Sequence, residues 1–102
     1  MLEIRPNCEN CGTDLKPSSV NAFICSFECT FCKTCALDIL HNVCPNCGGG
    51  FERRPIRPSL NLKNGNYLGV HPASEKPVIK AVDTSAHETF ASEIRKISPN
   101  MR

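Results

Sequence analysis

The sequence has no tryptophan, one tyrosine and no long apolar run. Its longest apolar-rich stretch, from Ala36 to Leu40, is far shorter than the ~20 apolar residues of a membrane-spanning helix. The first residues, MLEIRPNCEN, contain no apolar core of a secretory signal, and no N-x-S/T acceptor for glycosylation occurs. We therefore expect a cytoplasmic protein with no membrane partner. In a reducing cytosol its cysteines would stay reduced.

Cysteine is the residue that is abundant here. The chain has 102 residues, and all eight cysteines lie within the first 47. A segment of ~50 residues buries too little apolar surface to fold without disulfides or a metal, and reduced thiols favour the metal. The composition predicts a metal-stabilised module at residues 1–58, a loop-rich connector at 59–83 and a C-terminal helix within 84–102. In the connector, Asn64-Gly65 offers a turn for a small hairpin with Leu62 opposite Tyr67.

The charges are divided unevenly between the two halves of the chain. Residues 1–47 carry three Lys/Arg against five Asp/Glu, whereas residues 48–102 carry nine against five. The formal charge is +2, but two divalent ions on eight thiolates would bring it to about −2. Net charge therefore gives little support to nucleic acid as a partner, and we expect a protein partner. The oligomeric state does not follow from the sequence.

The cysteines follow the pattern C-x2-C-x13-C-x3-C-x2-C-x2-C-x8-C-x2-C. Two intervening residues let the chain curl so that both sulfurs of a pair meet one tetrahedral zinc ion, at about 2.3 Å each. Glycines follow two of the pairs, at Gly12 and Gly48, and permit the positive φ that such a turn often needs. Eight thiolates in this arrangement predict two Zn²⁺ cofactors, each held by four cysteines.

Local structure decides which cysteines share an ion. Residues 22–25 are typical of a short strand, and Phe27 and Phe31 flank a return strand, so Cys25 and Cys29 lie around a tight hairpin. From Cys35 to His41 the apolar spacing is helical, with either Leu37 and Leu40 or Ala36, Ile39 and Leu40 facing inward, and Asn42 ends the helix. A knuckle, a hairpin and a helix start form a treble clef, which gives zinc 1 the ligands Cys8, Cys11, Cys32 and Cys35. Zinc 2 then has Cys25, Cys29, Cys44 and Cys47.

This interleaved pairing resembles the cross-brace of RING fingers. Phe31 precedes the fifth ligand, and Cys44-Pro45-Asn46-Cys47 is similar to their closing C-P-x-C knuckle, although most RING fingers have histidine where Cys29 stands. The stretches LEIRPNCE, ICSFECTFC, VCPNCGG and RRPIRP also resemble a bacterial family, domain of unknown function 1272. The resemblance implies a small α+β, zinc-stabilised, RING-like module with no assigned activity, here followed by an extended tail that ends in a helix.

Two features of the second half leave alternatives open. Arg53, Arg54 and Arg57 form an extended basic segment, which is either a docking strip for an acidic partner or a solvated segment held by Ile56. Near the end, Ser85 and Glu88 form a capping box. An apolar stripe follows at helical spacing and predicts a helix that either docks on the module or binds a partner: Ala86, Phe90, Ile94 and Ile97.

No catalytic motif accompanies the cysteines, so we expect a structural zinc module for protein interaction and not an enzyme. With eight cysteines available, His41, His71 and His87 are not needed as ligands. Three alternatives remain: a zinc-thiolate redox sensor, an iron–sulfur electron carrier using Cys29, Cys32, Cys35 and Cys44, and a ubiquitin ligase. Among the residues corresponding to a ligase's contacts, Leu37 and Pro45 suit that role, whereas Glu9 and Gly48 do not.

Overall fold

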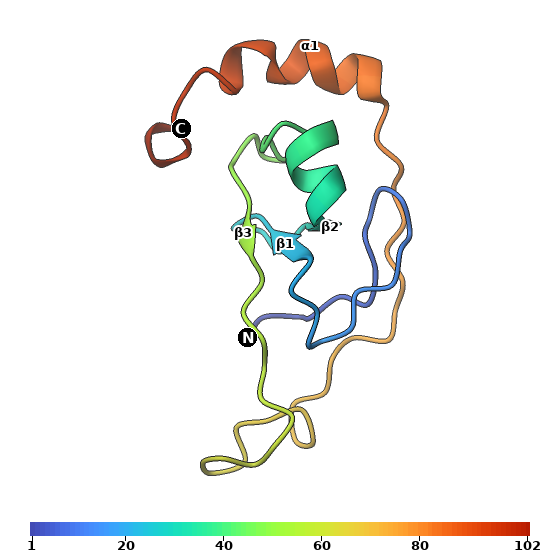
Figure 1. Cartoon of the computed structure of the whole chain (residues 1–102), viewed down its shortest axis with the longest axis vertical. Helices are drawn as coiled ribbons and strands as arrows, with labels where there is room; N and C mark the ends of the chain where they lie inside the picture. Colours follow the sequence, from blue (N-terminus) through green and yellow to red (C-terminus); the bar gives the residue numbers. More distant parts are fainter.

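A three-stranded antiparallel sheet lies at the centre of the molecule (Figure 1). The structure is a computed structural model that describes all 102 residues, and its dimensions are 45 × 27 × 18 Å. The sheet has the order β2-β1-β3, with β1 at Ala22–Ile24, β2 at Thr30–Cys32 and β3 at Glu52–Arg53. The third strand overlaps the segment that the sequence predicted to be extended only at Arg53.

The hairpin between β1 and β2 carries two of the cysteines. Phe23 pairs with Phe31 in its register, and beyond the strands the Cys25 N–H donates to the Cys29 carbonyl at 3.1 Å. Glu28 closes the turn with a φ of 68° and donates its N–H to the Cys25 carbonyl at 3.0 Å. The predicted hairpin is thus present, and its turn brings the backbones of both cysteines together.

A short helix, η1, follows the second strand. It spans Thr34–Ile39 and is a π-helix, because the Leu40 N–H donates to the carbonyl of Cys35, five residues back, at 2.8 Å. Positive φ values at His41 and Asn42 end it. Ala36 and Leu40 are completely buried, while Ile39, which one of the two predicted faces placed inside, is 38% exposed.

Cysteine sulfur supplies a large part of the core. Five of its eleven residues are cysteines, and the others include Leu15, Leu40 and an edge-to-face pair of Phe31 and Phe51 with ring centroids 5.3 Å apart. Aromatic and aliphatic side chains alone therefore form a small core. The stability of the module depends on what holds the thiols together.

Residues 59–83 form neither helix nor strand, and the hairpin predicted there is wrong. Asn64 and Gly65 do make a turn with positive φ, closed by the Asn66 N–H donating to Lys63 O at 3.0 Å. No strands flank this turn, and Leu62 is 74% exposed. Without an apolar face packed on the core, two short segments gain too little to pair.

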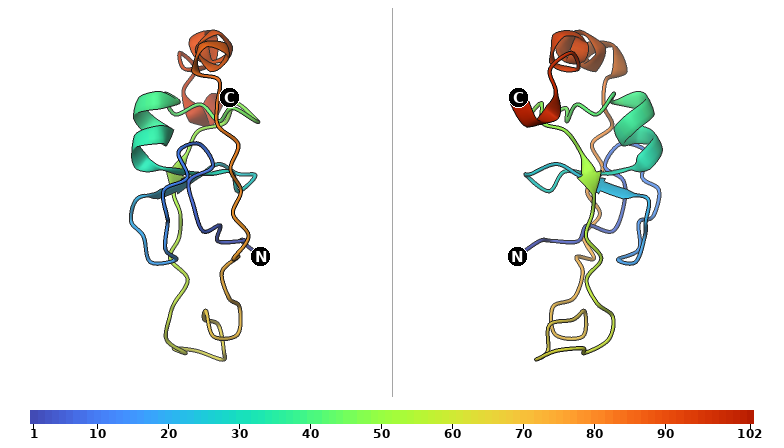
Figure 2. Two further views of the ribbon diagram at one scale, coloured as in Figure 1. Left: turned by 90° about the vertical axis from the view of Figure 1, so that its right-hand side faces the viewer. Right: turned by 60° about the vertical axis from the view of Figure 1, so that its left-hand side comes forward.

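The chain then returns along the cysteine module and lays helix α1, Thr84–Ile94, across its end (Figure 2). A 3₁₀ turn, η2, follows at Pro99–Met101. The predicted capping box is wrong: Asp83, in an extended conformation, accepts the Ala86 N–H at 3.1 Å, so the helix begins before Ser85 and does not use it as its cap. None of the helices is long and apolar enough to span a membrane.

The helix α1 packs on the cysteine module, but only partly through the predicted stripe. Its buried residues are His87 and Ala91, and the His87 Nε2 is 2.8 Å from the Val43 carbonyl. Ala86 is exposed, and Phe90 is 45% exposed. A polar side chain takes the central inward position because it satisfies a buried carbonyl, which the pattern of apolar residues does not reveal.

Both interpretations of the arginine segment are corrected by the structure. Arg54 is only 2% exposed and donates to the carbonyls of Arg5 and Lys16 at 2.8 and 3.0 Å. Arg57 donates to the carbonyl of His71 at 2.8 Å. Only Arg53 of the three is exposed, so no strip of free guanidinium groups exists. Ile56 does not anchor the segment, since it is 46% exposed.

Candidate metal centre

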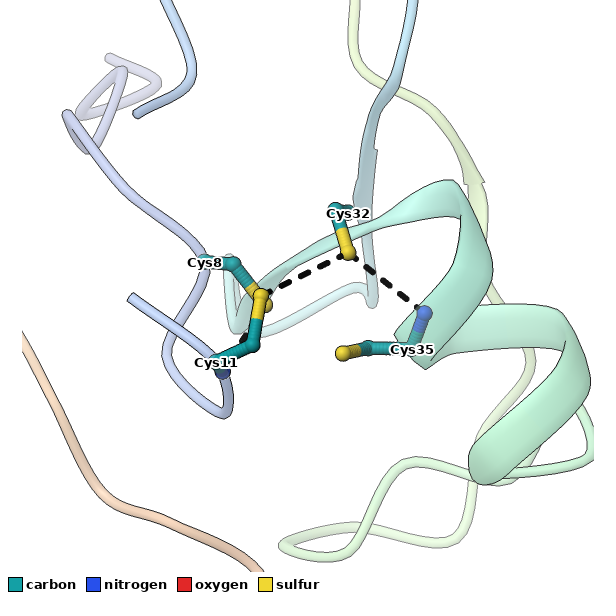
Figure 3. Close-up of side chains that lie close together, drawn as sticks. All are labelled: Cys8, Cys11, Cys32 and Cys35. Atoms are coloured by element: carbon teal, nitrogen blue, oxygen red, sulfur yellow. Dashed lines mark hydrogen bonds between the residues drawn. The ribbon is translucent and has the colours of Figure 1, made fainter. Parts of the chain in front are cut away.

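The first cysteine group gathers four thiols from two parts of the chain. The sulfurs of Cys8, Cys11, Cys32 and Cys35 all lie within 4.8 Å of one another (Figure 3). Cys8 and Cys11 come from the N-terminal loop, which closes on itself through a bridge between Asn7 and Asp14. The other two come from the end of β2 and the start of η1. The fold thus brings together the set of thiols that the sequence assigned to one ion.

The geometry of this group fits a tetrahedral metal ion. A tetrahedron with metal–sulfur bonds of about 2.3 Å has edges of about 3.8 Å, and the sulfurs of Cys11 and Cys32 are 3.8 Å apart. The backbone N–H groups of Cys11 and Cys35 point at the sulfurs of Cys8 and Cys32, each at 3.5 Å. Such donors favour the thiolate form that a metal requires.

The second group lies on the other side of the hairpin. The sulfurs of Cys25, Cys44 and Cys47 lie within 4.8 Å of one another. The Phe27 N–H is 3.3 Å from the Cys25 sulfur, and the Gly49 N–H is 3.4 Å from that of Cys47. This site therefore has the same kind of N–H···S support as the first.

Cys29, the fourth predicted ligand of the second site, is beside this group but outside the 4.8 Å set. Its sulfur accepts a hydrogen bond from the Asn46 Nδ2 at 3.3 Å. Burial is the largest cause of the raised pKa of Cys25 and of Cys44, and the nearby Cys29 thiol adds to the rise in both. Cys29 thus neighbours both residues, and whether it is a ligand stays a prediction.

Burial raises the pKa of Cys25, Cys32, Cys35 and Cys44, so these thiols hold their protons more firmly when no cation is present. It is the largest cause of the raised pKa of Cys35 and Cys44, and neighbouring thiols add to it. Burial acts in the same direction on Cys8, but backbone N–H groups, chiefly that of Cys11, lower its pKa below the ordinary value. A divalent ion entering either group therefore has to displace protons.

A repeated pentapeptide, which the sequence analysis passed over, builds both sites. Residues 8–12 and 44–48 both read C-x-N-C-G. In each, the glycine has a φ of 78° and donates its N–H to the first cysteine's carbonyl, at 3.0 Å for Gly12 and 2.8 Å for Gly48. The asparagine side chain donates to a sulfur of another segment, at 3.4 Å from Asn10 to Cys35. The recurrence of Asn inside both pairs was the available signal.

Polar side chains near the two cysteine groups mostly contact other residues of the chain. Neither group includes a histidine. Glu9, between Cys8 and Cys11, is 3% exposed; its carboxylate is 2.9 Å from the Arg5 guanidinium and accepts the Thr30 N–H. A cavity of about 290 Å³ lies between the two knuckles and the C-terminal segment, with Glu9, Phe31, Pro45 and Phe90 in its wall.

Comparison with known proteins places the chain in a family. A protein of Rhizobium meliloti (strain 1021), itself described as uncharacterized, is 52% identical over 80 residues, which are 78% of this chain and 88% of the relative. No solved structure matches. The family model described as "Protein of unknown function (DUF1272)" matches residues 1–57, which confirms the resemblance seen in the cysteine motifs. The chain therefore belongs to the DUF1272 family.

Proposed function

We propose that the chain is a structural zinc module that mediates protein interaction, with two zinc ions in a RING-like treble-clef cross-brace. The observation that carries the proposal is the interleaving of the thiols: Cys8 and Cys11 meet Cys32 and Cys35 across the hairpin, while Cys25 meets Cys44 and Cys47. Two ions bound in this way would tie the N-terminal loop, the hairpin and the segment after η1 into one unit.

Zinc is the ion that suits these ligands best. Thiolates are soft, zinc accepts four of them in a tetrahedron, and a structural site of this kind is coordinatively closed. A bound zinc ion would supply cross-links where five of the eleven core residues are cysteines, and it would offer no open position to a substrate. For this reason we propose that the protein catalyses nothing by itself.

The metal part of the proposal is tested by counting and substitution. Elemental analysis of protein purified without added metal should give two zinc ions per chain. Cobalt substitution should give the absorption of tetrahedral thiolate sites. Cys29→Ser should weaken the binding of one zinc ion and leave the binding of the other unchanged. Cys35→Ser should weaken the binding of the other ion. Iron with a brown colour would support the electron-carrier alternative, and a single zinc ion would refute the two-site proposal.

Exposed apolar side chains on the cysteine module support the interaction part. Phe27 is 72% exposed at the tip of the hairpin between Cys25 and Cys29, and Val20 is 56% exposed. We propose that Phe27 contributes to a protein-binding surface, in place of the arginine segment. Zinc-loaded wild-type protein and a Phe27→Ser variant should be compared as baits. A partner held by the wild type and lost with Phe27→Ser supports this role, and equal capture removes it.

Two features argue against the ligase alternative. Glu9, where a ligase has an exposed apolar contact, is buried and paired with Arg5. A Cβ at Gly48, where a ligase has a basic residue, would lie 3.5 Å from the Ile94 side chain of α1. Both places are therefore occupied by this chain itself. Discharge of ubiquitin from a charged conjugating enzyme would overturn the proposed lack of activity.

One observation favours the redox sensor as a second candidate. Cys11 and Cys47 are exposed, one in each group, and the Cys11 sulfur is 3.8 Å from that of Cys32. An oxidant such as peroxide could take two electrons from this pair, form a disulfide and release the ion. A sensor predicts zinc release at low peroxide that a thiol reductant reverses. Retention of zinc until irreversible oxidation would refute it.

A further inference from the structure

The backbone of residues 78–83, called the strap below, lies along the first cysteine knuckle. The Asn7 Nδ2 donates to the Val78 carbonyl at 2.9 Å, and the Lys80 N–H donates to the Glu9 carbonyl at 2.7 Å. The Val82 N–H donates to the Asn10 side-chain oxygen at 2.9 Å. The strap leads directly into α1, which covers the second knuckle at Gly48.

Two asparagines connect this strap to the cysteine sulfurs. Asn10 accepts the Val82 N–H with its oxygen and donates its Nδ2 to the Cys35 sulfur at 3.4 Å. Asn46 occupies the same position in the second knuckle. It donates its Nδ2 to the Cys29 sulfur at 3.3 Å, and its oxygen is 3.5 Å from the Lys80 ammonium. Each amide therefore joins one sulfur to one residue of the strap: that of Cys35 in the first group, and that of Cys29 beside the second.

The donor half of each amide depends on the position of the sulfur. A bound metal ion fixes its thiolate ligands at about 2.3 Å from itself. When the ion leaves, nothing fixes the sulfurs that accept from Asn10 at 3.4 Å and from Asn46 at 3.3 Å. An amide held at its sulfur has its oxygen fixed toward the strap, whereas an amide that has lost this contact is held less firmly.

We propose that Asn10 and Asn46 are positioning residues that couple the strap to the two metal centres, so that loss of the metal releases residues 78–94. This inference rests on the proposed zinc binding. Release of the strap would remove Lys80, Val82 and Asp83 from the wall of the 290 Å³ cavity and uncover Phe31 and Pro45. Because coupling between two sites is reciprocal, loosening the strap must also weaken the binding of the metal.

The strap side of the coupling is tested without touching a ligand or an asparagine. Val82→Pro removes the N–H that Asn10 accepts. Ala81→Pro is the matched control, because the Ala81 N–H donates no hydrogen bond to the module. For full-length, zinc-loaded Val82→Pro, we expect the affinity for one of the two ions, measured by competition with a chromogenic chelator, to fall about 10-fold, the lower end of the effect of outer-shell changes on metal sites. The affinity for the second ion should equal that of the wild type.

The asparagine side uses hydrogen exchange as its readout. Asn10→Asp keeps the acceptor oxygen but replaces the donor with a carboxylate, and Asn66→Asp makes the same charge change in the exposed connector turn. With zinc bound, Asn10→Asp should raise the exchange of the amides of residues 78–83 about 10-fold, the effect of one lost hydrogen bond on local opening, whereas Asn66→Asp should leave it unchanged. Removal of zinc from the wild-type protein by a chelator should raise the exchange of the same amides further.

The outcomes separate this inference from the proposed function. Wild-type protein that holds no zinc would refute the metal proposal and, with it, the coupling. If the wild type holds two zinc ions but Val82→Pro binds both of them as tightly as the wild type, the coupling alone is refuted. The same conclusion would follow if the strap of Asn10→Asp exchanged no faster than that of the wild type.

Discussion

Replacement of Arg54 by methionine should destabilise the module more than any exposed charge change. This guanidinium is 2% exposed and faces carbonyl oxygens: Arg5 at 2.8 Å, Lys16 at 3.0 Å and, less closely, Leu15 at 3.3 Å. Arg54 directly follows β3 and therefore links this strand to both ends of the N-terminal loop, at Arg5 and at Lys16. Methionine fills much of the same volume and donates nothing.

The magnitude follows from these contacts. A hydrogen bond to a charged group contributes about 1.5–3 kcal/mol, so the two shorter contacts account for about 3–6 kcal/mol. The cost of burying the cation, which lowers the pKa of Arg54 below its ordinary value, offsets part of this gain. We expect a net loss of about 3 kcal/mol, a large share of the roughly 5–15 kcal/mol that stabilises a small domain.

The assay is urea unfolding of zinc-loaded protein followed by far-ultraviolet circular dichroism. With a slope of about 1–1.5 kcal/mol per molar urea, the midpoint of Arg54→Met should fall by about 2–3 M. Arg53→Met, at the exposed neighbour, is the control and should move it very little. Arg54→Lys keeps the charge but loses the planar guanidinium group that donates to several carbonyls at once. Its midpoint should therefore lie between those of Arg54→Met and Arg53→Met. A midpoint for Arg54→Met equal to that of Arg53→Met would refute the reasoning.

Four further outcomes are expected. Removal of zinc by a chelator should abolish the dispersion of amide signals in NMR spectra, because a structural zinc contributes about 10–16 kcal/mol. Since burial raises the pKa of Cys35 in the metal-free protein, zinc binding should release protons and weaken on acidification, as calorimetry in buffers of different ionisation enthalpy would show. His87→Leu leaves the Val43 carbonyl without its partner and should speed hydrogen exchange throughout α1. Gly48→Ala, at a φ of 78°, should cost about 1 kcal/mol in urea unfolding.

The elements that the sequence predicted best are those with a local signal. The hairpin turn between Cys25 and Cys29 and the helix after Cys35 follow from short-range spacing, and the structure has both. The end of that helix at Asn42 is also a local property, because a positive φ favours asparagine over most residues. The small α+β fold class and the family membership followed from these few motifs.

The errors lie where a side chain finds a distant partner. Arg54 was expected to be in solvent, but its partners are carbonyls 38–49 residues away in the chain. His87 occupies an apolar position for the same reason, since its partner is the carbonyl of Val43. Charge and hydropathy do not reveal such pairings, because any buried carbonyl can accept a hydrogen bond and the sequence does not mark which one is free.

These distant pairings also define the extent of the folded unit. The family match ends at residue 57, yet carbonyls of the cysteine module accept hydrogen bonds from beyond it: Ile4 O from the Ser74 N–H, and Glu9 O from the Lys80 N–H. The Rhizobium meliloti relative is aligned over 80 residues, so its similarity continues outside residues 1–57. A backbone segment that satisfies buried polar groups belongs to the fold even without regular secondary structure. The connector and α1 are therefore part of the unit that holds the two cysteine groups in place.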